Sequence, residues 1–514
     1  MNFSFFQKSN RPTLIFFYLT IILLSLFVHF ALSSYAFDDA YIHFRIAENY
    51  LKNGEPYFNQ GENILVTSSI LYTIILTALF MLFGVGITGP ILLNAVVLPV
   101  SCYFFARLAC VICRKESVLL EMLVALIVFL LAFQASAGLM ETPLCLLLVG
   151  WGLLLYCLGY WQGLSLLALS IFVRLETAPL FALTVAHAFF VSSFQKRTIF
   201  KGFAFGFFPL FFWQIYFFET LTPSAVAAKK KVYSLTLFET LSFIKEHVYS
   251  DFVVTIFPQF LIGHFFLLTA FAIFYLFSRC PAVIKKENFA FVPFFWGVSV
   301  ACAYAFSGSL VFPWYHPLYS VPIFFSLIVF AFSFSEKQRN LLLTTLVVPV
   351  LLVHIPDLYF SLFDKTCYAY FQEGARVRKY LELGEKLRKE HPQAKIMASE
   401  IGGLGFAFKG YIYDAVGIAS PPALEHHPLK IPEQRESGML GSIPTDYALR
   451  VRPDIIVSIA GLVENNFQER LKSDYKLEET SIFIEQDMLA HSNPNVWGHK
   501  IIQIYYLRSE REKL

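Results

Sequence analysis

Charged residues are scarce in this sequence. Asp, Glu, Lys and Arg make up only 15% of the 514 residues, whereas 57% are hydrophobic and 18% are aromatic. Such a composition excludes an ordinary soluble enzyme and indicates a membrane protein. The two signs nearly cancel, with 40 Lys and Arg against 37 Asp and Glu. The net charge therefore gives no reason to expect a nucleic acid or a strongly acidic partner.

Cysteine is nearly missing from the polar part of the chain. Seven of the eight cysteines lie in apolar stretches or next to them, and only Cys367 lies in the polar C-terminal region. A disulfide framework and a zinc-binding cysteine pattern are therefore excluded there.

The charges that exist are placed unevenly. Residues 362–514 hold 20 Lys and Arg and 21 Asp and Glu, more than half of all charges. We therefore expect a membrane domain at 1–361 and a water-soluble domain at 362–514. Lys8 and Arg11 precede an apolar run from Thr13 to Ser34, which is too long for a cleaved signal and indicates a retained first helix.

Apolar runs divide the membrane domain into eleven expected spans. They lie near 13–34, 90–111, 117–134, 143–160, 162–175, 177–194, 202–218, 252–277, 289–308, 316–334 and 340–361. Residues 67–83 are apolar enough to cross as well. If they instead form an interfacial or half-embedded helix, the basic clusters near 8–11, 107–115, 196–201, 279–286 and 337–339 all fall inside, as the positive-inside rule requires. We therefore expect a cytoplasmic N-terminus and a C-terminal domain outside.

The C-terminal region alternates helical and strand patterns, which predicts a small α/β unit. We expect helices at 371–390 and 466–477, strands at 395–399, 454–459 and 500–507, and a tight turn at 402–405. The glycines Gly402, Gly403 and Gly405 do not have the GxGxxG spacing, so a nucleotide site is not favoured.

Four polar segments face outward in this topology: 35–66, 138–142, 219–251 and 307–316. The first begins with Asp38 and Asp39, directly after the first span. Two adjacent carboxylates at a membrane boundary carry a desolvation and repulsion cost, which suggests a function or a cation partner. The alternative is a solvated loop start that favours the following helix through its dipole.

Four ordered motifs carry a resemblance to known enzymes. They are DDAYIHFR at Asp38–Arg45, SAGLMETPL at Ser136–Leu144, FVRLETAPL at Phe172–Leu180 and YFFETLTPSAVAAK at Tyr216–Lys229. Together they resemble the GT-C glycosyltransferases that use polyprenyl-phosphate-linked sugars, in particular the terminal arabinofuranosyltransferases of the mycobacterial envelope and their proteobacterial relatives. The resemblance implies a polytopic α-helical GT-C fold followed by the soluble α/β domain. The motifs also differ from the family pattern, so arabinose is not carried over as the donor sugar.

The resemblance also implies catalytic roles. Asp38 matches the family's catalytic carboxylate and is the expected general base, with Asp39 as a second acid. Glu141 would assist them, although it also reads as an N-cap before Pro143. A divalent cation, Mg or Mn, is a possible cofactor, held by Asp38 and Glu141 if present. Lys229 is the expected ligand of the donor phosphate, the alternative being contact with lipid headgroups.

Four further side chains are candidates for binding donor or substrate. Arg174 and Glu176 either contact sugar or phosphate or form a buried structural ion pair. His316 is a phosphate ligand or general acid, unless it belongs to an interfacial aromatic belt. Arg45 lies two turns after Asp38 on the expected helix, and the alternative interpretation is that it is only a surface charge of that helix.

The expected function is an integral-membrane inverting glycosyltransferase of the bacterial inner membrane, active on the periplasmic face. Its partners would be a polyprenyl-phosphate sugar, an envelope glycan or glycolipid acceptor, and membrane lipid. Two alternatives stay open: a lipid-linked-glycan polymerase or ligase, which usually relies on outward Arg and His, and a flippase-type transporter, which would show internal repeats.

Overall fold

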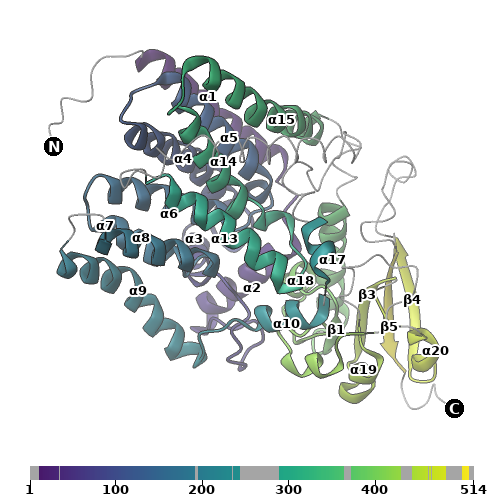
Figure 1. Cartoon of the computed structure of the whole chain (residues 1–514). Coiled ribbons are helices and arrows are strands. Elements are labelled where there is room, and N and C mark those ends of the chain that lie inside the picture. Colours follow the sequence, from purple (N-terminus) through teal and green to yellow (C-terminus); the bar gives the residue numbers. More distant parts are fainter. Residues whose placement is uncertain are drawn as a thin grey trace.

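The structure is a computed structural model. It describes residues 11–33, 35–190, 195–233, 235–242, 289–363, 372–429, 443–460, 462–464, 466–481 and 501–508. Helices fill the N-terminal part, and a small mixed sheet with its own helices lies at one side of them (Figure 1).

Six described helices are long and apolar enough to cross a membrane. They cover Pro12–Ala31 in α1, Thr88–Cys113 (α4), Val118–Ala137 (α5), Lys196–Phe218 (α9), Pro313–Ala331 with α14, and Glu336–Phe363 (α15). Shorter apolar helices are Ile70–Phe83 (α3), Thr142–Cys157 (α6), Leu175–Phe190 with α8, and Phe291–Ser307 (α13). The expected helices are therefore confirmed at these places, and the run at 252–277 lies outside the described residues.

Helix α7, Gln162–Ser170, occupies the short run expected to cross at 162–175. Nine residues rise only about 14 Å at 1.5 Å each, less than the hydrocarbon core. The helix at 67–83 is confirmed as α3, while its depth in the membrane and the number of crossings stay predictions.

Small residues let the bundle helices approach closely. A Cβ on Gly163 of α7 would lie 2.5 Å from the carbonyl oxygen of Gly152 in α6, and one on Gly206 of α9 would lie 2.2 Å from that of Ser165. Such small contacts are typical of helix packing in membranes, where no hydrophobic force drives the helices together.

The C-terminal domain is built on a five-stranded sheet in the order β2-β1-β3-β5-β4. Its strands are Ile396–Ala398 (β1), Ile412–Asp414 (β2), Ile455–Ile459 (β3), Tyr475–Ser481 (β4) and Ile501–Leu507 (β5). β1 pairs in parallel with β2 and β3, and β5 pairs antiparallel with β3 and β4. The helices are Gln372–Glu390 (α17), Gly402–Phe408 (α18), Thr445–Val451 (α19) and Phe467–Leu471 (α20). The expected α/β unit is confirmed.

Two local predictions in this domain are wrong. The helix expected at 466–477 ends at Leu471, because from Tyr475 onward the chain forms β4 and pairs with β5. The glycines at 402–405 do not form a turn but begin α18.

The membrane and C-terminal domains share a hydrophobic core. Helix α2, Asp38–Asn53, lies in the first polar segment. Its Ile42 and Ile46 are buried in the same cluster as Leu383 of α17 and Leu404 of α18. Phe58 from the loop after α2 joins that cluster. The two domains therefore meet between residues 361 and 362 in the sequence, but their side chains pack into one common core.

Candidate active site

Helix α2 begins at the acidic pair. Asp38 and Asp39 lie in its first turn, where carboxylates interact favourably with the helix dipole. The preceding residue is held in place, because the Phe37 amide donates to the carbonyl of Gly138 at 3.1 Å. A Cβ at Gly138 would lie 2.2 Å from the Phe37 ring, so the SAGLMETPL motif needs glycine there to receive α2.

Asp38 is bound by the C-terminal domain. Its carboxylate accepts hydrogen bonds from the backbone amides of Gly402 at 2.9 Å and Gly403 at 2.8 Å. Burial raises the pKa of Asp38 above its ordinary value, and the two N–H bonds offset this only in part. An elevated pKa makes the carboxylate a stronger proton acceptor.

Asp39 faces a different partner. Its Oδ2 lies 3.7 Å from Nζ of Lys229, which comes from α10, Ser224–Tyr233. Lys229 also donates to the hydroxyl of Tyr315 and lies over the ring of Phe312, at 4.7 Å from its centroid. Burial alone would lower the pKa of Lys229, but Tyr315 and Asp39 raise it above its ordinary value, so the ammonium stays charged.

Arg174 forms a buried ion-pair network with the other two acids. Its Nη1 lies 2.5 Å from Glu141 and its Nη2 lies 2.7 Å from Glu176. Burial alone would raise the pKa of Glu141, but the Arg174 guanidinium holds it below its ordinary value. Glu141 also stands 3.6 Å from Nε2 of His43 in α2, and Tyr304 donates to Glu176 at 2.7 Å.

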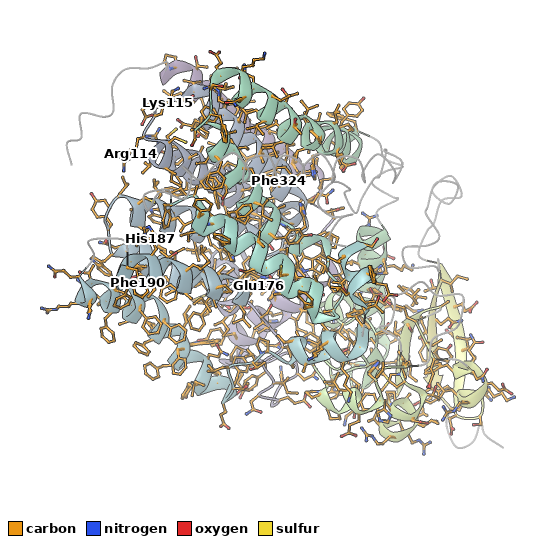
Figure 2. All side chains as sticks on the ribbon, in the orientation of Figure 1. Arg114, Lys115, Glu176, His187, Phe190 and Phe324 are labelled. Atoms are coloured by element: carbon orange, nitrogen blue, oxygen red, sulfur yellow. The ribbon has the colours of Figure 1, made fainter. Side chains whose placement is uncertain are left out.

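Tyr315 joins the two cationic groups. The Arg174 guanidinium lies 4.3 Å from the Tyr315 ring centroid, and Nζ of Lys229 lies 4.9 Å from it. Asp39, Glu141, Arg174, Glu176 and Lys229 are therefore connected through Tyr315 and short contacts, although they come from four separate motifs. Asp38 precedes Asp39 in the chain, and its carboxylate contacts Gly402 and Gly403 instead. Figure 2 shows Glu176 beside α13 in the middle of the molecule, and Arg114 and Lys115 at the edge of the bundle away from the sheet.

Two expected site residues lie elsewhere. Arg45 is buried and donates to backbone carbonyls, among them Phe58 at 2.8 Å and Gly405 at 2.9 Å, so it joins α2 to the C-terminal domain. His316 is buried, and its ring is parallel to that of His354 in α15, at 6.2 Å between centroids. Neither contact involves the acidic pair.

Sequence reasoning missed several members of the site. His43 stands within the first motif. Tyr315 directly precedes His316, in the segment for which an interfacial aromatic belt was the alternative interpretation. Gly402 and Gly403 gave no local signal, because their contact with Asp38 spans more than 360 residues.

The expected cation ligands Asp38 and Glu141 have protein partners in this arrangement, and a shared ion stays a prediction. The oxygens of Asp38 accept backbone amides, and Glu141 is paired with Arg174. Among the described residues, Cys110, Glu116 and Glu121 are three potential metal ligands that lie close together. Arg107 already contacts both of these carboxylates.

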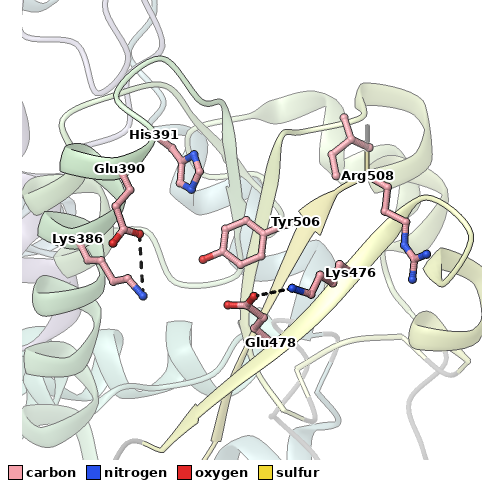
Figure 3. A pocket seen from close by; sticks show the side chains of 8 residues that line it. Lys386, Glu390, His391, Lys476, Glu478, Tyr506 and Arg508 are labelled. Atoms are coloured by element: carbon pink, nitrogen blue, oxygen red, sulfur yellow. Dashed lines mark hydrogen bonds and ion pairs between the residues drawn. The ribbon is translucent and has the colours of Figure 1, made fainter. Parts of the chain in front are cut away.

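A surface hollow on the C-terminal domain lies apart from these residues. Figure 3 shows it between the end of α17 and strands β4 and β5, and it is lined by Lys386, Glu390, His391, Lys476, Glu478 and Tyr506. Its charges pair locally, Lys476 with Glu478 at 3.2 Å and Lys386 with Glu390 at 3.9 Å.

Comparison with solved structures identifies the architecture. ArnT from Cupriavidus metallidurans in the apo state is similar with a TM-score of 0.52 and 11% identity, over 96% of this chain and 98% of ArnT. The chain has a GT-C fold. ArnT bound to undecaprenyl phosphate is similar with a TM-score of 0.47 and 12% identity, over the same shares. The arabinofuranosyltransferase AftD from Mycobacteria is similar with a TM-score of 0.49 and 13% identity, over 96% of this chain and 40% of AftD.

At these identities the likeness concerns the fold alone, and the GT-C fold expected from the four motifs is confirmed. No family model matches the sequence, and no curated protein does.

Proposed function

We propose that the chain is a membrane glycosyltransferase that moves a sugar from a polyprenyl-phosphate donor to an envelope glycan or glycolipid, with inversion, on the periplasmic face of the bacterial inner membrane. One observation carries the proposal. Lys229 and Arg174, from two different motifs, both lie against Tyr315, and Lys229 also faces Asp39 of the acidic pair. The GT-C fold is consistent with this assignment.

Lys229 is suited to hold the donor phosphate. It stays charged although its side chain is only 14% exposed, and its 3.7 Å separation from Asp39 is longer than a direct hydrogen bond. A phosphate can therefore take a position beside the ammonium, which stabilises negative charge on the leaving group. Arg174 supplies a second positive charge against the Tyr315 ring, and its guanidinium is fixed by Glu141 and Glu176.

Asp38 is suited to be the general base. A carboxylate offers about four lone-pair positions, so two remain after the amides of Gly402 and Gly403 are accepted. The acceptor hydroxyl gives its proton to Asp38 while its oxygen attacks the anomeric carbon. The bond from that carbon to the phosphate oxygen breaks, and its electron pair leaves with the lipid phosphate. A single displacement of this kind inverts the anomeric centre.

The direct test is transfer by the purified full-length protein. Given a polyprenyl-phosphate sugar and an envelope glycolipid, it should release polyprenyl phosphate and form a glycoside of inverted configuration. Activity with a soluble nucleotide sugar alone would contradict the proposal. Joining of preassembled lipid-linked glycans without use of the monosaccharide donor would instead show a polymerase or ligase.

A matched pair of lysine variants tests the phosphate site. Lys229→Ala should raise the donor KM by about tenfold or more, because it removes a partly desolvated cation beside the phosphate. Lys230→Ala removes the same charge from the next position, which is exposed, and should leave the donor KM near the wild-type value. Equal effects of the two substitutions would argue for a general attraction to anionic lipid.

A further inference from the structure

The contact between Asp38 and the C-terminal domain assigns that domain a part in the reaction. Resting on the function proposed above, we propose that the backbone amides of Gly402 and Gly403 are positioning groups that orient the Asp38 carboxylate for proton transfer. The C-terminal domain thereby completes the catalytic centre.

The geometry is specific to these two glycines. One carboxylate oxygen of Asp38 accepts from Gly402 at 2.9 Å and the other from Gly403 at 2.8 Å. With both oxygens held, the carboxylate cannot rotate freely, and its remaining lone pairs point in fixed directions. Orientation of this kind matters because a displacement of about 1 Å at a reacting group can cost on the order of a hundredfold in rate.

The approach of the two backbones requires glycine at the first position. A Cβ on Gly402 would lie 1.8 Å from the carbonyl oxygen of Asp38, so no larger residue fits while α2 and α18 keep their positions. A Cβ on Gly403 would lie 3.6 Å from Oδ1 of Asp38 and 3.1 Å from Val377. An alanine at this position therefore requires only a small shift of Val377.

The surroundings of this contact are charged. Glu400, two residues before Gly402, pairs with Arg376 of α17 at 2.8 Å, where the Arg376 side chain is buried and that of Glu400 is 12% exposed. The charged and titratable groups that act on Asp38 from the packed elements include Asp39 of α2, Arg376 and Tyr380 of α17, and Glu400. Docking of the domain is reinforced elsewhere by Tyr411, whose hydroxyl donates to Glu62 at 2.6 Å.

Kinetics of full-length variants test the proposal. Gly402→Ala should lower kcat by on the order of a hundredfold with little change in donor KM, because it displaces the groups that orient the base. Gly403→Ala keeps the amide and should show a smaller loss. Tyr411→Phe removes a docking hydrogen bond of the same interface without touching Asp38, and its kcat should match the wild type.

A double-mutant cycle separates orientation from general damage. In an Asp38→Asn background, Gly402→Ala should cause little further loss, because the group that it orients is already disabled. A further hundredfold loss in that background would overturn the proposal, as would a Gly402→Ala variant with the wild-type kcat.

Amide hydrogen exchange tests the contact of Asp38 with Gly402 and Gly403 without an assay of sugar transfer. The peptide that contains Gly402 and Gly403 should exchange faster in Asp38→Ala than in the wild-type protein, and equal rates would overturn the proposal. Wild-type protein without transferase activity would overturn the proposed function and this inference with it. An active wild type with an unaffected Gly402→Ala would overturn this inference alone.

Discussion

Asp38 and Asp39 are adjacent in the sequence, yet their carboxylates have different partners. Asp38 faces two backbone amides and Asp39 faces an ammonium group. In the first turn of a helix, successive side chains point in directions about 100° apart, which explains the separation. Their substitutions should therefore have different kinetic consequences.

Asp38→Asn is expected to lower kcat by about two to four orders of magnitude, the usual cost of removing a general base, with donor binding largely retained. Asp39→Asn should cost less and act partly through the donor KM, because it removes the partner of Lys229. Steady-state release of polyprenyl phosphate measures both. An active Asp38→Asn together with an inactive Asp39→Asn would exchange the two roles.

Glu141 is expected to be a stability determinant as well as a site residue. Glu141→Gln removes the negative charge beside Arg174, whose side chain is only 3% exposed, and leaves a buried cation paired with Glu176 alone. Breaking a buried pair in this way costs about 3 kcal/mol, to be measured as a lower midpoint of thermal unfolding. Glu425→Gln breaks the exposed pair with Arg450 and should cost less than about 1 kcal/mol. Equal midpoints for both variants would contradict the prediction.

Glu400 should make stability fall as pH rises. Burial raises its pKa to about 7, with Arg376 opposing and Asp38 reinforcing the shift. The folded protein therefore holds a proton that the unfolded chain releases near pH 4.5, and this contribution to stability, present below that pH, is lost as pH rises through about 7. Between pH 5 and 8, the thermal midpoint of the wild type should fall relative to that of Glu400→Gln. Parallel pH curves would show that Glu400 ionises normally.

At the scale of elements, α2 shows what could be predicted from the sequence. Its start, its acidic pair and the apolar helices around it follow from local patterns, namely apolar runs of sufficient length and one motif. The packing partners of the side of α2 that carries Ile42, Arg45 and Ile46 could not be predicted. These partners, α17 and α18, lie more than 300 residues further along the chain. The same limit applies to β4, where pairing with β5 prevails over a helical pattern.

Arg45 is the clearest case of such a long-range role. Its guanidinium donates to the carbonyls of Phe58, Gly405 and Gly410. A lysine cannot donate to all three carbonyls at once, because its N–H donors share one nitrogen atom. Arg45→Lys should leave buried carbonyls without donors, at about 1 to 3 kcal/mol each, and make the C-terminal domain more sensitive to limited proteolysis. Lys52→Ala removes a mostly exposed ammonium group from Glu48 on the same helix, and Glu48 keeps its pair with Lys409, so this variant should behave like the wild type. Unchanged proteolysis of Arg45→Lys would show that the shared core suffices.

For the molecule as a whole, the sidedness of the membrane decides whether the site can work as proposed. Arg114 and Lys115 lie at the edge of the bundle away from the C-terminal sheet (Figure 2), and short basic loops favour the cytoplasm. Asp38 of the acidic pair, by contrast, contacts the C-terminal domain. A reporter fused after Leu514 should therefore be accessible from the periplasm, and one fused after Lys115 should not. A C-terminal reporter accessible only from the cytoplasm would place Asp38 and Lys229 on the inner face and contradict transfer to a periplasmic acceptor.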